Sequence, residues 1–226
     1  MKRILTIVAF CLSLATVSIA QPPQLLSDLG IVQDDELKEV QNRIEAKVDD
    51  FQHYVQVLAG GGNLSHEAKI VICEKALDLF IGKGEPFLTR VPNPNGGFTD
   101  EIHEAVKMST INAKYNKKRS SYPMSTYLST LIKRSESSNY HYKPLVIKTA
   151  DVVYVDNYSK VEEGRYTATA HILQHFMGYG KDGVQYEDYT VKTITVYIDR
   201  IGTDAPDGMD YYWEILLGDV DCDDIW

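Results

Sequence analysis

Apolar residues recur every three or four positions between Leu37 and Leu58, which predicts one long amphipathic helix. Asp34, followed by two further acidic residues, suits the N-cap and the first turn. Three glycines at 60–62 are expected to end the helix. The expected buried stripe consists of Leu37, Val40, Ile44, Val48, Phe51, Val55 and Leu58.

A shorter pattern of the same period predicts a second helix from Ser65 to about Ile81. Gly82 and Gly84 are expected to end it. Two helices joined by a short glycine turn predict a helical hairpin. Residues 85–100, which are rich in proline and glycine, are expected to form a loop.

After about His103 the apolar residues follow the two-residue period of strands. Residues 105–112 are expected to form a strand, and Pro123 can occupy the first turn of a short helix. Breaks rich in glycine and acidic residues then separate four further expected strands, at roughly 145–158, 164–178, 184–200 and 211–220.

Alternation is clearest in the strand expected at 164–178, which predicts one packed face and one wetter face. The residues expected on the packed face are Tyr166, Ala168, Ala170, Ile172 and Phe176. Those expected on the other face are Thr167, Thr169, His171 and His175.

This order of elements resembles the cone-shaped α+β superfold shared by nuclear transport factor-like proteins, ketosteroid isomerases and scytalone dehydratase. The segments from KTADVVYVDNYSKVEEGRYTATAHI to YYWEILLGDV especially resemble uncharacterised secreted bacterial proteins of that superfold. The resemblance covers about residues 34–220, with 85–102 as an extra loop. It implies a helical hairpin packed on a curved, mostly antiparallel sheet, with a pocket at the mouth of the cone. Relatives include enzymes and binding proteins, and homodimers through the open sheet face are common, so fold alone does not select a function.

The first twenty residues have the pattern of a secretory signal peptide. Lys2 and Arg3 precede an apolar run, and Ser18-Ile19-Ala20 places small residues before a cleavage site between Ala20 and Gln21. The run is shorter than the ~20 apolar residues that span a bilayer. A retained membrane anchor is the alternative. We expect export to a bacterial periplasm or the exterior, and a mature chain that does not span the membrane.

A length of 226 residues leaves room for one well-buried domain. The expected division is a signal peptide at 1–20, an irregular leader at 21–33, a single α+β domain at 34–220 and an acidic tail at 221–226.

The net charge of the chain is −9, and loss of Lys2 and Arg3 would make it more negative. This argues against a nucleic-acid partner, because phosphate backbones repel acidic proteins. The basic cluster at 114–119 is interpreted as a solvated loop, with an anion-binding patch as the alternative. The 15 tyrosines indicate a tyrosine-rich sheet or, alternatively, a ligand-stacking surface.

Two cysteines, Cys73 and Cys222, follow the expected cleavage site. Export would permit a disulfide. However, Cys73 lies on the apolar helix face and Cys222 lies in the expected acidic tail. We therefore expect no bond between them, with Cys73 buried and reduced and Cys222 exposed.

No metal or cofactor site is predicted. His171 and His175 would stand about 13 Å apart along a strand, too far to share one metal ion. The acidic segments at 204–210 and 219–224 lack the order of ligands that an EF-hand loop requires.

The strand carboxylates Asp151 and Asp188 are the candidates for acid/base catalysis, which would require a pKa shifted by apolar walls inside the cone. A further set is interpreted as plain core or, alternatively, as a pocket wall: Tyr166, Ile172, Phe176 and Trp213.

The first functional hypothesis is therefore an exported, non-catalytic binding or interaction module for a small molecule or a protein. The alternatives are a pocket enzyme of the isomerase, dehydratase or hydrolase type, and a structural component of the cell envelope.

Overall fold

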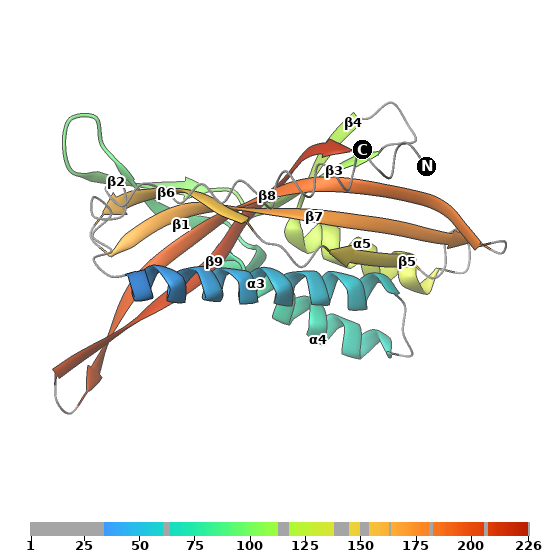
Figure 1. Ribbon diagram of the computed structural model, residues 1–226, viewed down its shortest axis with the longest axis horizontal. Coiled ribbons are helices and arrows are strands. Elements are labelled where there is room, and N and C mark those ends of the chain that lie inside the picture. Colours follow the sequence, from blue (N-terminus) through green and yellow to red (C-terminus); the bar gives the residue numbers. More distant parts are fainter. Residues whose placement is uncertain are drawn as a thin grey trace. The chain divides into compact units, whose positions relative to one another are not determined.

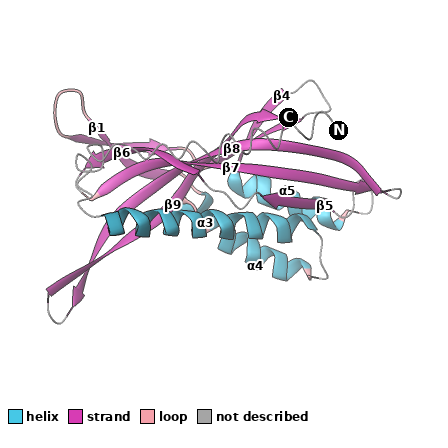
Figure 2. Cartoon of the chain, viewed as in Figure 1, coloured by secondary structure: helices cyan, strands magenta, loops and turns pink. Residues whose placement is uncertain are grey.

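A computed structural model shows that the chain has an α+β fold (Figure 2). The contacts reported below lie within the compact unit Lys38–Trp226. The predicted signal peptide, its cleavage site and the leader lie outside the described residues. The structure describes residues 34–60, 64–112, 118–137, 145–149, 154–162, 164–180, 183–205 and 208–225.

Three α-helices occur in this part of the chain, α3 (Asp34–Gly60), α4 (His66–Leu77) and α5 (Met124–Glu136). The apolar stripe of α3 is buried from Val40 to Leu58, as its spacing predicts. None of the helices among these residues has the length and apolar character needed to cross a membrane.

Helix α4 begins as predicted but ends earlier than expected. The hydroxyl of Ser65 caps it by accepting a hydrogen bond from the backbone N–H of Ala68 at 3.2 Å. The expected continuation to Ile81 is wrong, because the chain turns after Leu77 and pairs with a strand. The Leu217 N–H donates to the Leu79 carbonyl at 2.9 Å, and a short 3₁₀ helix, η1 (Ile81–Gly84), follows.

Most strands belong to one curved, mostly antiparallel sheet with the order β4-β3-β9-β8-β7-β5, in which β6 also pairs with β7 (Figure 1). Only the pairing of β3 with β9 is parallel among the described strands. The strands of this sheet are β3 (Lys107–Asn112), β4 (Lys118–Pro123), β5 (Leu145–Thr149), β6 (Tyr154–Glu162), β7 (Arg165–Gly180), β8 (Gly183–Ala205) and β9 (Gly208–Ile225).

The strand expected at 145–158 is two strands, β5 and β6. Both pair with the same edge of β7, β5 along Gln174–Gly178 and β6 along Arg165–His171. The expected meander of long strands is confirmed, since β7, β8 and β9 are consecutive antiparallel neighbours.

The loop expected at 85–100 is instead a two-stranded hairpin of β1 (Phe87–Pro92) and β2 (Phe98–His103). The prolines and glycines surround its turn, where the Asn93 N–H donates to the Gly97 carbonyl at 2.9 Å. Leu88 and Ile102 are 65% and 80% exposed. Because apolar residues also lie on the exposed side of this hairpin, its sequence does not alternate between apolar and polar residues in the way that predicts a strand.

The predicted alternation in β7 is confirmed from Tyr166 to Ile172. Tyr166, Ala168, Ala170 and Ile172 are buried, whereas the residues between them are half-buried. The expected place of Phe176 on the packed face is not confirmed, because Phe176 is half-buried and its neighbour Met177 is buried instead.

Contacts of α3 help to define the buried face of the sheet. The Arg43 guanidinium donates to the Trp213 carbonyl at 3.2 Å, and the Phe51 ring meets the Phe80 ring edge-on at 5.0 Å.

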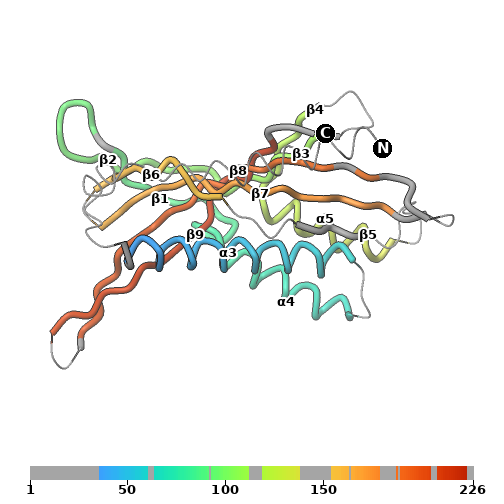
Figure 3. The backbone as a smooth tube through the Cα atoms, in the orientation of Figure 1, coloured from blue at the N-terminus to red at the C-terminus, as the bar shows by residue number. Residues whose placement is uncertain are grey.

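Pairing between β7 and β8 ends at Arg165 and Asp199, after which β8 and β9 continue as a two-stranded arm (Figure 3).

Both cysteines are free and buried, so the expected exposure of Cys222 is wrong. The reason is that β9 continues to Ile225, through the segment expected to be an acidic tail. The Cys222 thiol donates to the Ser109 carbonyl at 3.0 Å. Burial raises the pKa of both thiols.

Substitution Phe51→Ala should lower the free energy of unfolding by about 3–5 kcal/mol, because it leaves a cavity where the two rings meet. Urea denaturation measures the change. The control Ile102→Ala removes an apolar side chain that is already in solvent and should stay within about 0.5 kcal/mol of the parent. Equal losses in the two variants would contradict the packing described for α3.

Candidate functional site

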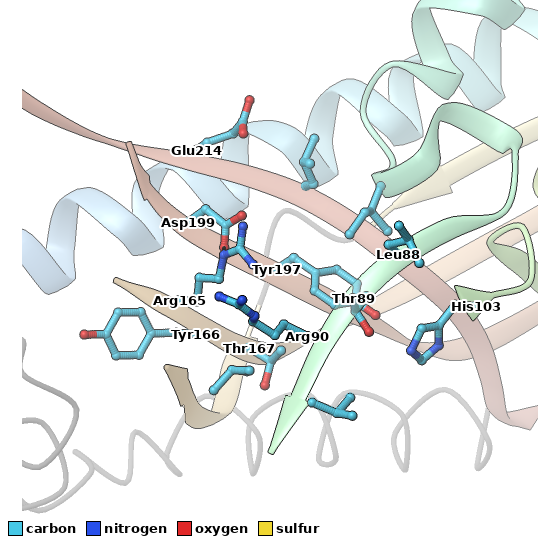
Figure 4. A pocket seen from close by; sticks show the side chains of 14 residues that line it. Leu88, Thr89, Arg90, His103, Arg165, Tyr166, Thr167, Tyr197, Asp199 and Glu214 are labelled. Atoms are coloured by element: carbon cyan, nitrogen blue, oxygen red, sulfur yellow. Dashed lines mark ion pairs between the residues drawn. The ribbon is translucent and has the colours of Figure 1, made fainter. Parts of the chain in front are cut away.

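A cleft of about 280 Å³ lies between β1 and the face of the sheet opposite to the buried one (Figure 4). The alternation of the strands determines which side chains reach it, because every second residue of β7, β8 and β9 points to this face. The polar and aromatic residues that line it include Thr89, Arg90, Arg165, Thr167, Tyr197 and Asp199.

A row of charged residues crosses four strands at one end of the cleft. Strand register places Glu162 of β6 opposite Arg165 of β7, Arg165 opposite Asp199 of β8, and Asp199 opposite Glu214 of β9. Residues opposite each other in antiparallel strands have Cβ atoms about 4.5–5.5 Å apart. The Arg165 guanidinium bridges two of the carboxylates, with Nη1 3.2 Å from Glu162 Oε1 and Nε 3.6 Å from Asp199 Oδ1.

Arg90 connects the β1–β2 hairpin to this row. Its Nη1 donates to Glu162 Oε2 at 3.3 Å, and its Nε lies 3.6 Å from Asp100 Oδ1 on the paired strand. Glu162 thus forms one ion pair with an arginine of the hairpin and one with an arginine of the sheet. Its side chain is only 16% exposed, which reduces the screening of these pairs by solvent.

Aromatic rings form a second contact between hairpin and sheet. The Phe87 ring stacks on His103 at 5.3 Å and meets the Tyr197 ring edge-on at 6.2 Å. Gly218 leaves the space for Tyr197, because a Cβ at this position would lie 2.8 Å from Tyr197 Cε2. Burial raises the pKa of Tyr197, and Asp219 contributes. The phenol therefore stays neutral at physiological pH.

Asp199 has the most perturbed environment of the carboxylates in this row. Burial raises its pKa, Arg165 opposes the shift, and the negative charges of Glu214 and Glu162 add to it.

The wall also contains an unsatisfied polar atom, since Nε2 of His103 is buried without a hydrogen-bond partner among the described residues. Such an atom costs about 1–3 kcal/mol unless water or a ligand pairs with it.

The side chains of both predicted catalytic carboxylates lie outside the described part of the chain. Asp151 lies outside the described residues. Asp188 is placed by its backbone in β8, opposite Phe176 of β7, and its side chain lies outside the described part.

The predicted pocket-wall residues are only partly brought together. Tyr166 borders the cleft, and its ring lies 5.8 Å from Trp213 in an edge-on contact. Ile172 is buried and Phe176 is half-buried farther along β7, and neither lines the cleft.

The two histidines of β7 are each bonded to a different carboxylate. His171 Nε2 lies 2.9 Å from Asp156 Oδ1, and His175 Nε2 lies 2.7 Å from Glu187 Oε1. Among the described residues, no group of three or more histidine, cysteine, aspartate or glutamate side chains could hold a metal ion.

The chain was compared with models of known protein families, with curated proteins and with solved structures, and none of the three comparisons finds a match. We therefore infer function from the residues of the cleft.

The pKa of Asp199 should lie above the usual value for an aspartate and should respond in opposite directions to its two neighbours. Glu214→Gln removes a negative charge and should lower it, whereas Arg165→Gln removes a positive charge and should raise it. Carboxyl ¹³C chemical shifts, followed against pH, measure all three values. A pKa of Asp199 that is unchanged in both variants would contradict the row of charges.

Proposed function

We propose that this protein is an exported binding module that holds a small ligand in the cleft between the β1–β2 hairpin and the sheet. The observation that carries this proposal is the convergence of charged and aromatic side chains from several strands on one concave site. Small-molecule sites in proteins combine apolar walls with a few polar groups in this way.

The walls of the cleft are held in place before any ligand arrives. Glu162 forms ion pairs with Arg90 and Arg165. The Tyr197 ring packs closely against Gly218. Side chains that are already ordered lose little conformational entropy on binding. This favours recognition of a ligand by a preformed site.

An acid/base enzyme is the second candidate, and Asp199 favours it. A carboxyl group with a raised pKa beside a cleft is what such an enzyme requires. In this hypothesis Asp199 takes the role that Asp151 or Asp188 was expected to have in an isomerase, dehydratase or hydrolase. A structural role in the cell envelope, the third hypothesis, would not require a cleft lined by charged groups.

We also propose that the chain belongs to the cone-shaped superfold of nuclear transport factor-like proteins. The order of elements supports this, with two helices, a strand pair, the short helix α5 and then the meander of β7, β8 and β9. In this proposal α3 and α4 form the expected hairpin, and β1–β2 is an insertion. On the basis of the same resemblance, we propose that the chain forms a homodimer through the open sheet face.

The export part of the proposal rests on the first twenty residues. Cleavage after Ala20 should give a mature protein that begins at Gln21. Intact mass spectrometry of protein isolated from the envelope fraction of the producing cell tests this. A mass that still includes residues 1–20 would contradict it.

A cleft-filling variant tests the binding site. Fragments that bind should shift the backbone amide resonances of Thr89, Thr167 and Tyr197 in NMR spectra of the parent, and Thr167→Arg should abolish these shifts by filling the cleft. The control Thr203→Arg places the same side chain on an exposed residue of the β8–β9 arm and should preserve them. Shifts that persist in Thr167→Arg, or a fragment library without any binder, would contradict the proposal.

A further inference from the structure

Carboxylates outnumber guanidinium groups around the cleft. Each arginine is already shared between two acidic residues, Arg165 between Glu162 and Asp199, and Arg90 between Glu162 and Asp100. Glu214 lines the cleft and forms no ion pair in the described part of the chain. The charge left uncompensated at this end of the cleft is therefore negative.

This charge is concentrated between two strands. Asp199 and Glu214 are direct partners in the register of β8 and β9, and Glu214 lies on the side of Asp199 away from Arg165 (Figure 4). Like charges directly opposite each other destabilise a strand pair. A positive group near both carboxylates would remove that repulsion, as Arg165 does on the other side of Asp199.

The rest of the cleft favours an organic cation over a metal ion. Ile81, Leu88, Val91 and Leu216 contribute apolar surface to the lining. Calcium requires six or more oxygen ligands, whereas an ammonium or guanidinium group needs only a few acceptors.

We propose that the cleft binds a small organic cation, in which a primary ammonium or guanidinium group contacts Asp199 and Glu214 and an apolar body lies against Leu88 and Leu216. This inference rests on the proposed binding function and specifies the class of its ligand.

Three probes with the same five-carbon body but different charge test the proposal: pentylammonium, 1-pentanol and pentanoate. Titration followed by amide NMR shifts at neutral pH and low salt gives each dissociation constant. Pentylammonium should bind about tenfold more tightly than the other two, because only it pairs with the carboxylates. N-pentylguanidinium, tested in parallel, shows which of the two cationic groups fits better.

Matched variants then locate the contact. Glu214→Gln should weaken pentylammonium binding several-fold and leave the affinity for 1-pentanol unchanged. The control Glu101→Gln makes the same change at an exposed position of β2 that does not line the cleft, and it should preserve both affinities.

Two kinds of result would overturn the inference. If pentanoate binds as tightly as pentylammonium, or if the two variants behave alike, the ligand is not selected by the carboxylates, although a binding cleft exists. If none of the probes, including N-pentylguanidinium, shifts the amides of Thr89, Thr167 or Tyr197, both this inference and the proposed binding site fail.

Discussion

The two-residue alternation of side chains along β7, β8 and β9 is the constraint on which the rest of the structure depends. One set of residues, represented by Ala170, Ile194 and Leu217, is fully buried. Burial of such a side chain contributes about 1.5–3 kcal/mol for a valine, leucine or isoleucine. A shift of one residue in register would expose this set to solvent, so the pairing of the long strands is strongly determined. The same register aligns the charged residues on the opposite face.

The β1–β2 hairpin converts that opposite face into a site. Arg90 bonds to Glu162, and the ring of Phe87 lies against that of Tyr197, so the hairpin has one polar and one aromatic contact with the sheet. An exposed two-stranded hairpin is marginally stable by itself. Its position therefore depends on these contacts, and the shape of the cleft depends on the hairpin.

The sequence predicts α3, α5, the meander and the packed face from Tyr166 to Ile172 well, because their apolar periodicity is strong. Part of the site could also have been predicted, since only a few residues separate β6 from β7 and β8 from β9 in the sequence, and the resulting register places Arg165 opposite Glu162 and Glu214 opposite Asp199. The register between β7 and β8, which places Arg165 opposite Asp199, could not be predicted in this way, because the pairing shifts after Gly178. Apolar alternation does not predict the β1–β2 hairpin, because both of its faces carry exposed residues.

The β1–β2 hairpin lies on the polar face of the sheet and forms one wall of the cleft. Nuclear Overhauser effects between the aromatic protons of Phe87 and Tyr197 test it most directly, since the two ring centroids are 6.2 Å apart. We expect cross-peaks between these rings, and between Phe87 and His103 as the reference contact within the hairpin. Cross-peaks within the hairpin without any between Phe87 and Tyr197 would contradict it.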